Sequence, residues 1–148
     1  MGPPRTRAGA RRLAGLLALG MVAALGCSRQ EEKFIPVAGQ VTVNGQPLAS
    51  GTVSFRPDPK RGNTSLHHPT GQIADGAFEL YTVRQRGAPP GWYRVLVFAD
   101  ENQTAGTVHP ALPRWATHPK YTKEQTTDLF VEVSDQAAPG AYDLRLSK

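Results

Sequence analysis

The stretch "VAGQVTVNGQPLASGTVSFRP", residues 37–57, decides the fold class of this chain. Apolar residues recur at every second position on both sides of an Asn-Gly pair, as Val41, Val43, Val53 and Phe55. A period of two is typical of a strand with one buried face. Asn and Gly accept the positive φ that a tight hairpin requires. The stretch therefore predicts two β-strands connected by turns.

The same alternation continues to the end of the chain. It predicts seven strands, at residues 37–43, 51–56, 71–74, 77–83, 92–99, 126–134 and 141–147. The fifth, "WYRVLVFA", is apolar on both faces and is expected inside a sheet. Two sheets packed face to face would bury it, so we predict an all-β, seven-stranded Greek-key β-sandwich, transthyretin-like or immunoglobulin-like. Six residues are predicted to be buried between the sheets: Phe78, Leu80, Val95, Val97, Leu129 and Val131.

Three segments carry a resemblance to a known family. Residues 37–57, "DGAFEL" and "GAPPGWYRVLV" resemble the Gly-x-Val, Asp-Gly-x-Phe and Gly-x-Tyr-x-Val elements of the carboxypeptidase regulatory-like, transthyretin-like domain. The ending "HPKYTKEQTTDLFVEV…YDLRLSK" is similar to small lipoproteins that carry this domain in planctomycete-type bacteria. The resemblance covers residues 36–148 and implies the fold and a lipoprotein context. It implies no activity, because one fold serves many functions.

The charge of the chain does not indicate a nucleic-acid partner. The formal net charge is +5 over 148 residues, but four arginines lie within the first twelve residues. From Cys27 onward 13 basic residues face 12 acidic ones. The predicted domain is therefore close to neutral, and we expect it not to bind nucleic acid.

Residues 1–26 have the pattern of an export signal. A basic head precedes the uncharged run "LAGLLALGMVAALG", residues 13–26. A helix of that length spans about 21 Å, which is less than the roughly 30 Å hydrocarbon core of a bilayer. The pattern predicts a signal helix rather than a membrane-spanning one.

Cys27 is the single cysteine of the chain, and it follows the apolar run directly. One cysteine allows no internal disulfide. "AALGC" resembles the bacterial lipoprotein box, which implies cleavage after Gly26 and lipidation of Cys27. The alternative is an ordinary signal peptide that leaves a free thiol. We predict a signal peptide at residues 1–26, a lipidated cysteine with a short tether at 27–36, and the β domain at 37–148.

A lipid on Cys27 would anchor the chain to a membrane without spanning it. Ser28 stands where the family commonly has the Asp that retains a lipoprotein at the inner membrane, so the outer membrane is favoured. The nine residues after Cys27 reach about 30 Å when fully extended. Across this tether "DPKRG", residues 58–62, could touch anionic headgroups. The alternative is a solvated loop.

No catalytic or metal site is predicted. There is no GxSxG elbow, and the domain has no cysteine, so no nucleophile is paired with a base. Two long loops carry all four histidines, His67, His68, His109 and His118. They could bind a soft divalent metal if the loops met at one end, but no carboxylate spacing supports this. We expect no cofactor.

The long loop "DENQTAGTVHPALPRWATHPK", residues 100–120, is the predicted partner-binding site, at Arg114, Trp115, His109 and His118. Trp is favoured at binding hot spots, and loops on a rigid scaffold often carry function. The alternative is a structural lid over the end of the sandwich. Trp92, Tyr93, Trp115 and Tyr121 could also form an aromatic surface, although Tyr93 is expected in the core.

The sequence thus favours a membrane-anchored, non-catalytic envelope lipoprotein with a structural or protein-binding β-sandwich. The alternative is a carbohydrate- or peptidoglycan-binding module. Aromatic side chains gathered on one exposed surface would decide for the second hypothesis.

Overall fold

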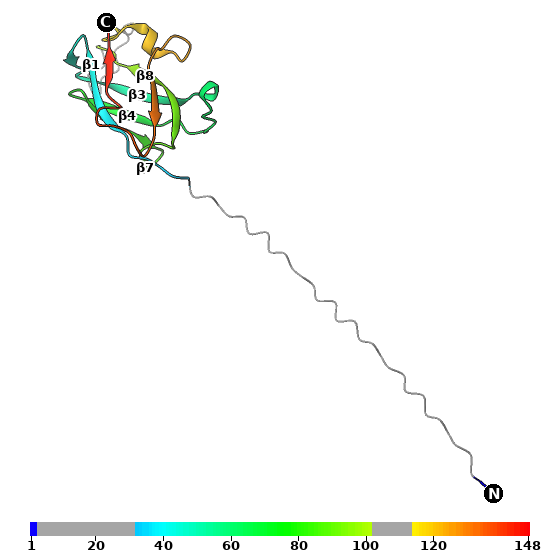
Figure 1. Ribbon diagram of the computed structural model, residues 1–148. Coiled ribbons are helices and arrows are strands. Elements are labelled where there is room, and N and C mark those ends of the chain that lie inside the picture. Colours follow the sequence, from blue (N-terminus) through cyan, green and yellow to red (C-terminus); the bar gives the residue numbers. More distant parts are fainter. Residues whose placement is uncertain (3–31, 102–113) are drawn as a thin grey trace. The chain divides into compact units, whose positions relative to one another are not determined.

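Strands dominate the part of the chain that the computed structural model describes, which is residues 1–2, 32–101 and 114–148 (Figure 1). The strands are β1 (Ala38–Val43), β2 (Gln46–Pro47), β3 (Ser50–Pro57), β4 (Thr70–Ala74), β5 (Ala77–Glu79), β6 (Tyr81–Thr82), β7 (Gln85–Arg86), β8 (Gly91–Phe98), β9 (Phe130–Val133) and β10 (Leu144–Leu146). Two 3₁₀ helices join them, η1 (Pro59–Arg61) and η2 (Pro119–Thr122). The predicted signal helix and Cys27 lie outside the described residues.

The strands form one sheet in the order β10-β1-β5-β4-β3-β8-β9, with β2, β6 and β7 attached beside this path. β1 and β10 run parallel, and the other pairs are antiparallel. The sheet curls around the core and is compatible with a β-sandwich (Figure 1). The predicted all-β fold is therefore confirmed. As predicted, β8 has a neighbour on each side, β3 and β9.

The two hairpin turns predicted from Gly-containing pairs have the expected backbone. Asn44 and Gly45 have φ of 49° and 83°, and Asp75 and Gly76 have φ of 49° and 80°. Positive φ at both central residues is the geometry that matches the twist of the flanking strands. These pairs therefore fix where β1 and β4 end.

The predicted period of two places the core as expected, with one exception. Phe78, Leu80, Val95, Val97 and Val131 are buried. Leu129 is only partly buried against the core, so its predicted full burial is wrong. It lies outside β9, which begins at Phe130, so the core covers it less completely than it covers Val131.

Some strands are shorter than predicted. The segment 77–83 divides into β5, which pairs with β1 and β4, and β6, which pairs with β4 and β7. β2 and β7, each of two residues, were not predicted, because two residues are too few for a periodic signal.

The domain has two ends, which we call proximal and distal. At the proximal end, residues 32–36 lie beside the loop 58–69 and the hairpin β6–β7: Glu32 contacts His67, and Ile35 pairs with Ala88. At the distal end, Asn44 and His118 donate backbone N–H groups to the Leu146 and Ser147 carbonyls, both at 2.9 Å. β1 runs from the first end to the second (Figure 1).

Candidate functional site

The described part of the predicted binding loop, residues 114–118, is fixed to the distal end by its backbone. Trp115 forms an isolated antiparallel bridge with Asp100. Glu101 donates its N–H to the Arg114 carbonyl at 2.7 Å, and Ala116 donates to the Ala99 carbonyl at 2.8 Å. These bonds hold the loop against the chain that leaves β8, so its side chains are positioned by the sheet.

Arg114 extends into solvent from this loop. Its side chain is 78% exposed, and its Nε lies 3.3 Å from Glu101 Oε2. The second carboxylate oxygen of Glu101 accepts a hydrogen bond from Lys148 Nζ at 2.7 Å. This hydrogen bond, aided by the charges of Lys148 and Arg114, lowers the pKa of Glu101. Because a guanidinium has five donors, Arg114 retains capacity for a further acceptor.

Trp115 and His118 differ in exposure, since His118 is exposed and Trp115 is not. Trp115 is half-buried, a placement that fits both a lid and an anchor. His118 caps η2, since its Nδ1 accepts the Lys120 N–H at 3.1 Å. That ring nitrogen is therefore occupied. The structure brings Arg114, Trp115 and His118 to one end of the domain, whereas His109 lies outside the described residues.

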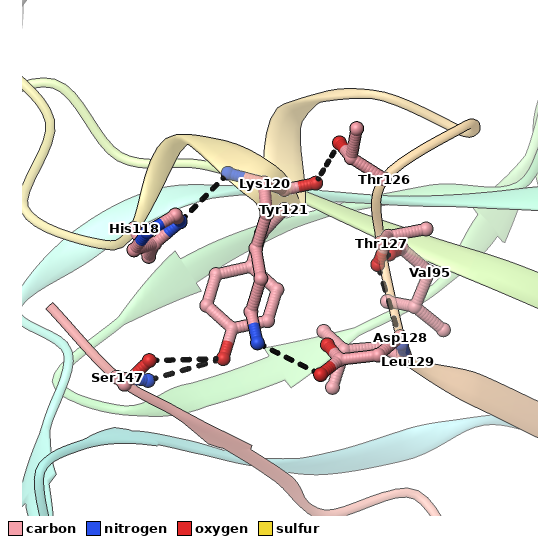
Figure 2. Close-up of polar contacts among 9 residues, drawn as sticks. All are labelled: Val95, His118, Lys120, Tyr121, Thr126, Thr127, Asp128, Leu129 and Ser147. Atoms are coloured by element: carbon pink, nitrogen blue, oxygen red, sulfur yellow. Dashed lines mark hydrogen bonds and ion pairs between the residues drawn. The ribbon is translucent and has the colours of Figure 1, made fainter.

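The helix η2 follows this loop directly and carries a buried tyrosine that was not predicted from the sequence (Figure 2). Tyr121 is buried, and its hydroxyl accepts the Ser147 N–H at 3.2 Å. Lys120 Nζ donates to Asp128 Oδ2 at 2.7 Å and lies 4.8 Å from the centre of the Tyr121 ring. Thr126 Oγ1 donates to the Lys120 carbonyl at 2.7 Å. Tyr121, rather than Trp115, is thus the deeply buried aromatic residue of this region.

The four aromatic residues that could have formed one surface do not gather on one. Tyr93 is fully buried, as expected, and Tyr121 is buried as well. Trp92 is half-buried on the outer face of β8, and the Arg61 guanidinium lies 4.9 Å from the centre of its ring. The same guanidinium lies 3.9 Å from the Phe130 ring. One face of each of these two rings is therefore covered by Arg61, which reduces the area open to a sugar.

The described histidines have separate partners. His67 Nε2 lies 2.8 Å from Glu32 Oε2, and His68 Nδ1 lies 2.6 Å from Arg56 Nη1, both at the proximal end. His118 lies at the distal end. Within residues 32–101 and 114–148, no three His, Cys, Asp or Glu side chains are close enough together to hold a metal ion.

An open groove of about 350 Å³ lies on the outer face of the sheet, lined by Thr70, Gly71, Gln72, Glu79 and Tyr81. The Tyr81 hydroxyl donates to Glu79 Oε2 at 2.9 Å, and Arg86 Nε contacts the other oxygen. These two contacts, first that with Tyr81, lower the pKa of Glu79. A carboxylate held in this way is a hydrogen-bond acceptor and is poorly suited to act as an acid.

Comparisons with protein-family models, curated proteins and solved structures give no match to this chain. Among the described residues there is no helix with the length and apolar character needed to cross a bilayer.

Proposed function

We propose that this chain is a lipid-anchored, non-catalytic protein of the cell envelope that binds a protein partner at the distal end of its β domain. Cys27 is the proposed lipidation site, and residues 1–26 are the proposed signal peptide. The proposed domain is of the carboxypeptidase regulatory-like, transthyretin-like kind. The proposed location is the outer membrane, because Ser28 follows the cysteine.

The observation that carries this proposal is the position of Arg114 and Trp115 relative to residues 32–36. The chain reaches the domain at the proximal end, where Ile35 pairs with Ala88. Arg114 and Trp115 lie at the distal end, beside Ala99 and Glu101. A lipid on Cys27 would bring the proximal end to the membrane and leave the distal end open to partners. An exposed Arg beside a half-buried Trp is a combination common at the centre of protein interfaces.

The test is a pull-down from solubilised envelopes with the domain and with Arg114→Ala and Trp115→Ala. Arg84→Ala is the matched control, because Arg84 is also exposed but lies in the β6–β7 hairpin at the proximal end. We expect both loop variants to lose the partner and the control to retain it. Melting temperatures measured in parallel separate binding from stability: a destabilised Trp115→Ala that keeps its partner would make Trp115 a lid and contradict the proposal.

A further inference from the structure

Exposed apolar side chains concentrate at the proximal end of the domain. The large hydrophobic residues that stand exposed in the described part of the chain are Met1, Leu66, Tyr81 and Val83. Leu66 belongs to the loop that contacts Glu32, and Tyr81 and Val83 belong to the β6–β7 hairpin. That hairpin continues into Ala88, which pairs with Ile35. Leu66, Tyr81 and Val83 thus belong to segments that contact residues 32–36, through which the chain enters the domain.

Leu66 is held in the open by an ordered loop. It is 93% exposed. On one side Asn63, which is buried, accepts the Ser65 N–H at 3.0 Å and donates to the Trp92 carbonyl at 2.9 Å. On the other side the His67 N–H donates to Ser65 Oγ at 3.2 Å. Because hydrogen bonds fix the loop on both sides, the exposure of Leu66 belongs to the fold.

Val83 is exposed in a backbone conformation that its side chain disfavours. It is 88% exposed and has φ of 58°. A β-branched residue with positive φ is a strained exception, whereas Gly, Asn or Asp would fit this turn. Strain of this kind is found at functional positions more often than elsewhere. The strain at Val83 therefore indicates a functional role for an apolar side chain at the tip of this hairpin.

Cations accompany both apolar tips. Lys60 lies in the same loop as Leu66, and Arg84 follows Val83 directly. Both are exposed, and neither forms an ion pair with another residue of the described chain. Tyr81 adds an amphipathic ring that is 44% exposed. Apolar tips flanked by Lys, Arg and Tyr match the interfacial region of a bilayer with anionic headgroups.

We propose that Lys60, Leu66, Tyr81, Val83 and Arg84, which we call the proximal face, contact an anionic lipid surface. This inference rests on the proposed lipid anchor at Cys27. Five residue steps separate Cys27 from Glu32, so the chain between them extends at most about 18 Å. Glu32 is bonded to the Leu66 loop through His67. A lipid on Cys27 would therefore keep Glu32, and with it the Leu66 loop, within that reach of the membrane.

The test uses residues 27–148 with Cys27→Ser, so that its result does not depend on lipidation. This chain retains every core residue, because the core lies between Ile35 and Leu146. Co-sedimentation with phosphatidylglycerol-phosphatidylcholine vesicles is compared with co-sedimentation with pure phosphatidylcholine vesicles. We expect a preference for the anionic vesicles that weakens as salt is added. Lys60→Gln with Arg84→Gln is expected to lower the anionic partition coefficient roughly tenfold or more.

A second variant tests the apolar tips. Leu66→Ser with Val83→Asn is expected to lower partition several-fold while the melting temperature stays equal or rises, since Asn accepts positive φ. Lys123→Gln with Arg145→Gln removes two exposed charges elsewhere and is expected to bind as the wild type does. Equal binding to both vesicle types, or equal loss in the control, would overturn the proposal. A protein captured through Leu66 in the absence of vesicle binding would assign this face to a protein partner and overturn it too.

Discussion

His67 Nε2 lies 2.8 Å from Glu32 Oε2 and thereby joins the segment that leads into the domain to the loop between β3 and β4. Phe34 adds a ring contact to the same histidine, with centroids 6.1 Å apart. These contacts make residues 32–36 part of the proximal end rather than a free linker. Under the proposed anchor, the proximal end is the end of the domain to which the anchored segment leads.

The buried side chains of the inner face are expected to dominate stability. Leu80 is fully buried, so Leu80→Ala should lower the free energy of unfolding by about 2–5 kcal/mol. Glu132→Ala, on the exposed side of β9, is expected to change it little. Urea unfolding of both variants measures the difference. Equal stability of the two would mean that the inner face has been assigned wrongly.

The bond between Tyr121 and the C-terminal strand is expected to contribute measurably. Tyr121→Phe keeps the buried ring but removes the acceptor of the Ser147 N–H, which should destabilise the domain by about 0.5–1.5 kcal/mol. Tyr81→Phe is the matched control, because the Tyr81 hydroxyl is exposed and bonds to Glu79 at the surface. Thermal unfolding of both variants distinguishes them. A Tyr121→Phe variant with unchanged stability would show that the bond between η2 and Ser147 does not stabilise the domain.

Relief of backbone strain should stabilise the β6–β7 turn. Val83→Asn is expected to raise the free energy of unfolding by about 1 kcal/mol, since Asn tolerates the left-handed region better than a β-branched residue does. Val83→Thr retains the branch and is expected to leave stability unchanged. A melting temperature that rises equally in both variants would show that the stabilisation comes from replacing an exposed apolar side chain and not from relief of the positive φ.

Stability is expected to fall in acid through Asp128. The hydrogen bond from Lys120 lowers the pKa of Asp128 below its ordinary value of 3.8. A carboxyl whose pKa is lower in the folded chain stabilises the fold above its unfolded pKa, and this contribution disappears as the pH falls through the folded pKa. Asp128→Asn should therefore flatten the stability profile below pH 3.8, as measured by unfolding at a series of pH values. If the profile of Asp128→Asn were as steep as that of the wild type, the pair of Lys120 and Asp128 would not be a source of the acid sensitivity.

The sequence predicted the strands and both hairpin turns because their signals are local. A period of two places Phe78 and Leu80 inside, and the pair Asn44 and Gly45 requires positive φ. The burial of Tyr121 was not predicted, because this residue lies in a one-turn helix without strand periodicity. Its hydroxyl contacts Ser147, which is 26 residues further along the chain and which no local pattern connects to it.

The candidate site was predicted less completely. Arg114 and Trp115 do lie together at one end, because they are adjacent in the chain and bridge to the residues after β8. The capping bond of His118 depends on the conformation of the following turn. The strain at Val83 arises because Thr82 pairs with Gln85 and leaves Val83 in the turn. No residue type in this segment predicts that pairing.

Both proposed surfaces depend on an anchor at Cys27. The most direct test is intact-mass measurement of the protein isolated from the membranes of the cell that makes it, followed by fragmentation at the amino terminus. We expect a chain that has lost residues 1–26 and carries acyl mass on Cys27. A Cys27→Ala variant is expected to be neither cleaved there nor acylated. A wild-type protein with an unmodified Cys27 thiol would contradict lipid anchoring.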